Sequence, residues 1–208
     1  MSATSGRLTG YEHAGKVPMN DPDAALMLDF ARGNDEAFVT LYRKYRDRMI
    51  AYCMRLLGER AVAEDAAQDV FLKLHGTRAS YKAQSRFSTF LYTIATRHCF
   101  NVRARLERKL VKRGVSVEDQ PTGARDADAE VENAELGMAI VASLTALPEK
   151  QRAALVLVHH EGLTYRDAAS VIDVSESAVK SLVFRARETL MQELLPMYEP
   201  MREVKHAL

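Results

Sequence analysis

Aromatic and basic side chains alternate between residues 80 and 109. A segment rich in aromatic and polar residues, 80–92, is followed by a helical pattern. That pattern carries seven basic or amide side chains: Arg97, His98, Asn101, Arg103, Arg105, Arg108 and Lys109. Ring faces can stack on exposed bases while cations follow the phosphates, so the segment predicts binding to single-stranded or melted nucleic acid. The alternative is that its apolar side chains only fill a core, which we expect for Leu91 and Ile94.

A carboxylate and amide cluster lies on one face of the helical pattern over 64–74. Five residues recur at the spacing of a buried face: Ala66, Ala67, Val70, Phe71 and Leu74. Asp65, Gln68 and Asp69 fall on the outward face. Clustered carboxylates could bind a metal or perform acid–base chemistry, but no His or Cys ligand accompanies them. A solvated face and a docking surface for a basic partner are the remaining interpretations.

A helix-turn-helix pattern follows near the C-terminus. Thr164, with Asp167 three residues later, can cap a short first helix, and Ser175 can cap a second one. Asp173 stands at the turn, where Asp tolerates a left-handed backbone better than most residues. The second helix would bury Val179, Leu182, Val183 and Ala186. Its outward residues, suited to a DNA major groove, are Ser177, Lys180, Ser181, Phe184, Arg185 and Arg187.

Three alternatives to a protein that binds nucleic acid through both blocks stay open at this point. The C-terminal motif alone could be an ordinary amphipathic hairpin with a solvated basic face. The whole chain could be an autonomous helix-turn-helix regulator with a helical effector or dimerisation domain. An enzyme such as a carboxylate-dependent nuclease is disfavoured, because the one suggestive cluster is His159, His160 and Glu161, and adjacent helical side chains diverge by about 100°. We expect no catalytic residues, no metal site and no cofactor.

The elements that position these groups are predicted to be helical. Apolar residues recur at helical spacing, as at Ala37, Leu41, Tyr45, Met49 and Cys53, and no segment alternates like a strand. Gly33, Gly58 and Gly76 divide the first block into several helices. An all-α fold with two small domains joined by a flexible acidic linker is the prediction. The ranges are a flexible leader 1–20, a first domain 21–112, a linker 113–134, a second domain 135–195 and a tail 196–208.

Charge is segregated along a chain that is nearly neutral as a whole. The 29 Lys and Arg residues offset 28 Asp and Glu residues, yet 78–113 holds ten basic residues and one acid, whereas 118–135 holds seven acids and one Arg. Such asymmetry indicates interaction with charged partners.

Cys53 and Cys99 lack metal-ligand or disulfide spacing, which favours a reduced compartment. No window reaches the roughly 20 apolar residues of a membrane span, so we expect a soluble protein without membrane insertion.

The order and spacing of these motifs resemble the extracytoplasmic-function (ECF) group of the bacterial sigma-70 family, over about residues 21–195. The stretches that carry the resemblance are 65–71 (DAAQDVF), 87–95 (FSTFLYTIA), 147–148 (LP), 162–165 (GLTY), 179–181 (VKS) and 184–187 (FRAR). The resemblance implies a sigma region 2 helical bundle and a sigma region 4 helix-turn-helix. It also implies promoter recognition, promoter melting and transcription initiation at a stress- or signal-dependent regulon in the cytoplasm.

Residue roles follow from the same resemblance. Asp65, Gln68 and Asp69 would dock on the beta-prime clamp helices of the RNA polymerase core, which would also offer its beta flap. The minus-ten element would be held by region 2, and the minus-thirty-five element by the outward residues of the second helix, with Lys180, Ser181, Phe184 and Arg185 as the leading contacts. The minus-ten set is Tyr81, Lys82, Gln84, Arg86, Phe87, Phe90, Arg97, Asn101 and Arg105. An anti-sigma factor is the implied regulatory partner.

Overall fold

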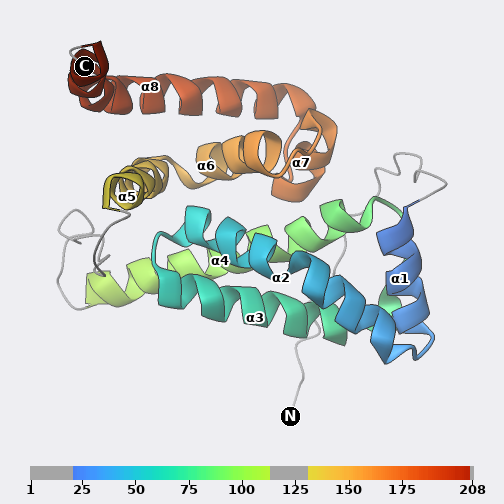
Figure 1. Ribbon diagram of the computed structural model, residues 1–208. Helices are drawn as coiled ribbons and strands as arrows, with labels where there is room; N and C mark the ends of the chain where they lie inside the picture. Colours follow the sequence, from blue (N-terminus) through green and yellow to red (C-terminus); the bar gives the residue numbers. More distant parts are fainter. Residues whose placement is uncertain (1–20, 113–130, 207–208) are drawn as a thin grey trace.

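Every regular element of the protein is helical in the computed structural model, which describes residues 21–112 and 131–206 (Figure 1). No strand occurs within those two ranges, so the predicted all-α class is confirmed. The predicted leader 1–20 and most of the predicted linker, 113–130, lie outside the described residues.

The first group of helices begins immediately after Asp21. It comprises α1 (Pro22–Ala31), α2 (Asp35–Leu57), α3 (Arg60–Gly76), the short 3-10 helix η1 (Arg78–Ser80) and α4 (Phe87–Lys112). The Asp21 carboxylate caps the first turns of both α1 and α4. It accepts the amide hydrogen of Asp23 at 3.1 Å and that of Phe87 at 2.7 Å. Both amides belong to a first helical turn that has no intrahelical acceptor. Asp21 therefore fixes where α1 and α4 begin relative to each other.

The core of this group is the buried face of α2 packed against α3 and α4. All five apolar residues that predicted the α2 face are buried, from Ala37 to Cys53. The Tyr52 and Thr96 hydroxyls share a hydrogen bond of 2.7 Å inside the core. The thiols of Cys53 and Cys99 lie 3.6 Å apart, a contact that their 46-residue separation did not suggest. The hydrogen bond with the Cys53 thiol, and then burial, raises the pKa of Cys99, which keeps it an unreactive core group.

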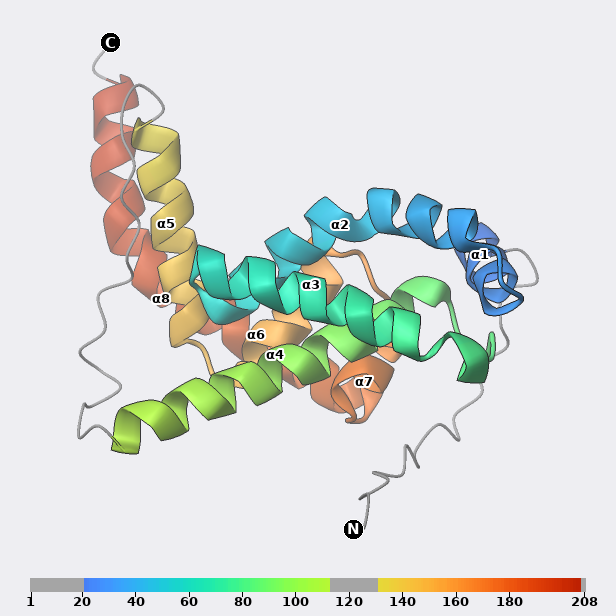
Figure 2. The same cartoon turned by 90° about the horizontal axis from the view of Figure 1, so that it is seen from below.

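The second group comprises α5 (Val131–Ala146), α6 (Glu149–Leu155), the π-helix η3 (Val156–His160), α7 (Tyr165–Ile172) and α8 (Glu176–His206). Two of its bounds differ from expectation. α5 begins inside the range predicted as linker, and α8 continues through the range predicted as a tail. The prolines at 196 and 200 had predicted that the helix ends there. A proline removes one backbone hydrogen bond and bends a helix, but strong helix formers on either side can still extend the helix. Figure 2 shows α5 and α8 side by side.

The two groups pack on each other, with α7 on α4 and with α5 and α6 against α2 (Figure 1). Arg152 of α6 is 1% exposed and lies at this boundary. Its guanidinium donates to the carbonyl oxygen of Leu56 in α2, and to those of Thr145 at 3.0 Å and Leu147 at 2.9 Å. Burial, and then the nearby Arg103, lowers the pKa of Arg152 to about 10, so the group is still cationic at neutral pH.

The end of α2 generates a stability prediction. Gly58 has φ +82°, and a methyl group at this position would lie 2.7 Å from Cγ2 of Thr145 across the boundary. Gly58→Ala should therefore lower the free energy of unfolding by about 1–2 kcal/mol through its left-handed backbone, and further through the clash. Thr145→Ser removes only the clashing methyl group, so urea denaturation of the double variant should show a loss smaller than the sum of the single losses. Strict additivity would contradict the contact.

Candidate nucleic-acid interface

The helix-turn-helix is set by the local groups that the sequence predicted. Thr164 accepts the amide hydrogen of Asp167 at 3.1 Å at the start of α7, and Ser175 accepts that of Ala178 at 3.1 Å at the start of α8. Asp173 occupies the turn with φ +54°, the left-handed conformation expected of it. The two helices are thereby fixed at a short, rigid connection.

α8 divides into the two predicted faces. Val179, Val183 and Ala186 are buried and Leu182 is partly buried, which anchors the helix on the rest of its domain. All six residues predicted to face DNA are exposed: Ser177, Lys180, Ser181, Phe184, Arg185 and Arg187. Phe184 is 62% exposed, although burial of its ring would be favourable. A large apolar group left in water beside cations is typical of a binding surface.

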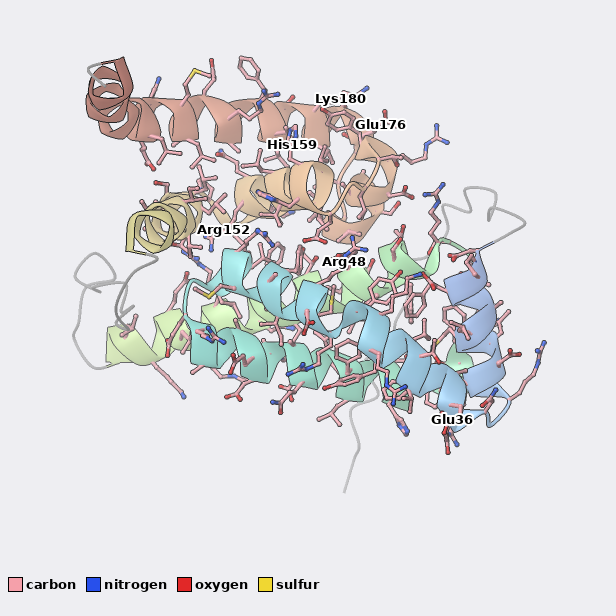
Figure 3. The ribbon with its side chains drawn as sticks, viewed as in Figure 1. Glu36, Arg48, Arg152, His159, Glu176 and Lys180 are labelled. Carbon is pink, nitrogen blue, oxygen red and sulfur yellow. The ribbon has the colours of Figure 1, made fainter. Side chains whose placement is uncertain are left out.

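Glu176 is a charged residue of this surface that sequence reasoning missed. Its carboxylate lies 3.2 Å from Nζ of Lys180 and 3.8 Å from Nε of Arg166. Figure 3 shows Glu176 and Lys180 close together at the beginning of α8. The spacing of four residues between them could have signalled the pair. Glu176 therefore competes with any anion for Lys180.

The loop before α4 presents its polar residues and hides two of its rings. Lys82, Gln84 and Arg86 are exposed. Phe87 is fully buried, and Tyr81 is nearly so. Burial raises the pKa of Tyr81 to about 12, so the phenol stays protonated.

In this structure, neither of these two rings offers the solvent-exposed face that base stacking requires. The Phe87 ring instead lies 5.4 Å from Tyr45, between centroids, within the core. Phe90 is partly exposed, with its ring centroid 5.0 Å from that of Tyr81.

A polar stripe continues from this loop along α4. Arg97, Asn101 and Arg105 are all exposed and recur every four residues, so they share one side of the helix. Arg103 is held differently, because it pairs with Glu107 at 3.0 Å and reaches the Thr145 carbonyl oxygen at 3.4 Å. The three predicted residues thus form a continuous surface that could follow a nucleic-acid backbone.

The carboxylate cluster of α3 has the predicted orientation and one additional member. The five apolar residues expected inside are buried, and Asp65, Gln68 and Asp69 are exposed. Leu72 was not predicted, yet it is 69% exposed and follows Gln68 by four residues, on the same side. An exposed leucine next to carboxylates is better suited to a protein partner than to a metal ion.

His98 of α4 contacts two side chains of α3. Its Nε2 lies 3.3 Å from a carboxylate oxygen of Asp69, and its Nδ1 contacts Nζ of Lys73. Burial, and then the charge of Lys73, lowers the pKa of His98. Burial also lowers the pKa of Lys73. His98 is therefore neutral at neutral pH and acts as a packed spacer between α3 and α4.

Within 21–112 and 131–206 no three His, Cys, Asp or Glu side chains gather in a way that could hold a metal ion. The His159, His160 and Glu161 cluster does not converge on a site, because Glu161 accepts a hydrogen bond from Tyr92 of the first domain. None of the helices in the described ranges has the length and apolar character that crossing a bilayer demands.

Two family models match the chain, and they coincide with its two groups of helices. The sigma-70 region 2 model covers residues 41–119, and the sigma-70 region 4 model covers residues 137–190. The RNA polymerase sigma-H factor of Pseudomonas aeruginosa is 30% identical over 192 residues, which cover 85% of this chain and 96% of that protein. The ECF RNA polymerase sigma-E factor of Haemophilus influenzae is 28% identical, covering 84% of this chain and 96% of that protein.

A solved structure has the same fold. The sigma factor RpoE of Bartonella quintana, in complex with the anti-sigma factor NepR, superposes with a TM-score of 0.62 at 24% identity, covering 76% of this chain and 96% of that one. Sigma region 2 and sigma region 4 are matched in the expected order along the chain. The chain is therefore a member of the ECF group of the sigma-70 family.

Proposed function

We propose that this chain directs RNA polymerase to promoters, with one promoter element read by each domain. The observation that carries the proposal is the exposure of all six outward residues of α8, on a helix that is capped and supported by α7. Such a helix can enter the major groove of the minus-thirty-five element. The chain would act in the cytoplasm as an initiation factor, catalysing no reaction itself, at genes that respond to stress or another signal.

The side chains of α8 suit direct reading of bases. Arg185 carries the planar fork that matches two acceptors of guanine, whereas Lys180 supplies a single point charge. Phe184 offers an apolar surface to a thymine methyl group. Ser177, Ser181 and Arg187 border these three and can bind base edges or phosphates.

The minus-ten element would be opened by capture of an unpaired base. Lys82, Gln84 and Arg86 form the exposed edge of the loop that would receive a base flipped from the non-template strand. Phe90 can offer a ring edge there, while Tyr81 and Phe87 would support the loop from beneath. The α4 stripe of Arg97, Asn101 and Arg105 would hold the adjoining backbone. No covalent bond changes, because binding to the unpaired strand shifts the melting equilibrium.

Two kinds of protein partner complete the proposal. The α3 face, consisting of Asp65, Gln68, Asp69 and Leu72, would dock on the beta-prime clamp helices of the polymerase core, and the second domain would lie near the beta flap. An anti-sigma factor would restrain the chain until its signal arrives, as the complex of the B. quintana relative with NepR suggests.

The proposal is tested by in vitro transcription of a fragmented genomic library with purified core polymerase, in the presence and absence of the chain. We expect new start sites that depend on the chain and share two spaced upstream motifs. Absence of such starts, together with tight binding of the chain alone to a palindromic duplex, would favour the autonomous regulator instead.

Core binding should depend on the α3 face. Replacing Asp65 and Gln68 together by Ala should weaken binding to core polymerase by roughly tenfold, because both lie on the exposed docking surface. Binding can be measured by fluorescence anisotropy of the labelled chain. The matched control is Glu36→Ala, which removes one negative charge at an exposed position on α2, outside the α3 face. This variant should bind core polymerase like the parent. Undiminished binding of the double variant would remove this face from the proposal.

DNA affinity should increase when Lys180 is released from its acidic neighbour. Glu176→Gln removes the carboxylate 3.2 Å from Lys180 and reduces repulsion of phosphates, so binding of the polymerase complex to a minus-thirty-five duplex should tighten by roughly two- to fivefold. Glu193→Gln makes the same charge change at an exposed position further along α8. Equal tightening by both variants would mean that net charge alone is responsible.

A further inference from the structure

Glu161 is a buried carboxylate that joins the two domains and has no part in the surfaces described above. Its side chain is only 5% exposed. It accepts a hydrogen bond from the Tyr92 hydroxyl of α4. It also lies 3.5 Å from Nη2 of Arg48 and 3.9 Å from Nη1 of Arg55, both on α2. We name these four residues the Glu161 cluster; three belong to the first domain, and Glu161 alone to the second.

The cluster has the features of a specific contact. A carboxylate removed from water is costly unless cations and hydrogen-bond donors compensate it, and here Tyr92, Arg48 and Arg55 all come from the other domain. Burial, and then the hydrogen bond to Glu161, raises the pKa of Tyr92, so this donor stays protonated. Figure 3 shows Arg48 at the boundary between the two groups of helices.

The backbone before Glu161 forms a π-turn, which changes the direction in which the Glu161 side chain points. Val156–His160 form a π-helix, and Glu161 follows directly. A π-turn holds one more residue than an α-turn, so it rotates the following side chains by about 100° relative to a continuous α-helix. Such turns recur at functional positions. The amide of Glu161 donates to the Val156 carbonyl oxygen at 3.1 Å, which closes this wider turn.

With its two domains packed together, the chain is too short to contact both promoter elements at once. About 25 base pairs separate the minus-ten and minus-thirty-five elements, which is roughly 85 Å of duplex at 3.4 Å per base pair. A compact chain of 208 residues has an expected radius of gyration of roughly 17 Å, which for a sphere means a diameter of about 45 Å. Both DNA-facing surfaces are exposed in the packed arrangement, yet they cannot reach both elements together. The domains must therefore separate.

We propose that the Glu161 cluster is an interdomain lock, which holds region 4 on region 2 in the free chain and must break before the chain spans a promoter. The first half of this inference concerns the free chain alone, and the second half rests on the proposed function. Breaking the lock exposes Glu161, Arg48 and Arg55 to water, which hydrates all three charges. Polymerase and DNA binding would supply the free energy that favours the separated state.

The test compares Glu161→Gln with Glu36→Gln, which makes the same charge change at an exposed position away from the boundary (Figure 3). Small-angle scattering of the free chain should show a radius of gyration larger by several ångströms for Glu161→Gln and unchanged for Glu36→Gln. The concentration giving half-maximal transcription with core polymerase should fall roughly threefold for Glu161→Gln, because more of the chain is already open. Unchanged dimensions of Glu161→Gln, or equal expansion of both variants, would overturn the lock.

Two further variants keep the test decisive. Tyr92→Phe removes only the hydroxyl and should give a smaller expansion with the same helical circular dichroism, so it decides the matter if Glu161→Gln fails to fold. Glu161→Lys should open the chain, and Arg48→Glu in that background should restore part of the compactness; absence of any restoration would contradict the pairing. Scattering needs neither polymerase nor DNA, so failure of the lock and failure of the promoter function are distinguishable.

Discussion

One buried guanidinium donates hydrogen bonds to both halves of this fold. Arg152 belongs to α6, yet it donates to the Leu56 carbonyl oxygen near the end of α2 and to two carbonyl oxygens at the end of α5. Carbonyls at the end of a helix have no partner within it and carry the negative end of its dipole, so one cation satisfies several of them. A small shift of the domains would remove the Leu56 acceptor while the charge stayed buried, which is costly, whereas full separation would return it to water. The contact therefore favours two discrete states, packed or apart.

The two surfaces proposed to bind DNA lie on faces that this packing leaves exposed. α8 buries Val179, Val183 and Ala186 and keeps its basic face outward, and α4 carries its stripe of Arg97, Asn101 and Arg105 on an exposed side. Packing of the two domains therefore leaves these residues, which we propose contact DNA, exposed, and it sets the distance between the two proposed surfaces. Separation of the two domains would therefore change the distance between the α4 and α8 surfaces, while both surfaces remain exposed to solvent in either state.

Helical periodicity predicted the faces of α2, α3 and α8, and capping chemistry predicted the turn at Asp173, because both depend on residues within a few positions of each other. Contacts between distant elements left no such signal. Arg152 and Glu161 gained their roles from partners in α2 and α4, and the proximity of Cys53 and Cys99 follows from packing alone. The extension of α8 past two prolines was also missed, because a proline lowers helix propensity only locally.

A distance measurement between the two domains shows whether the free chain is packed in solution. Spin labels attached at the exposed positions Glu36 and Met191, by an unnatural amino acid that leaves Cys53 and Cys99 untouched, report that distance by double electron–electron resonance. We expect one narrow distance distribution in the free chain and a shift to distances longer by tens of ångströms in the complex with core polymerase and promoter DNA. A free chain whose distribution is already as long and broad as that of the complex would contradict this expectation.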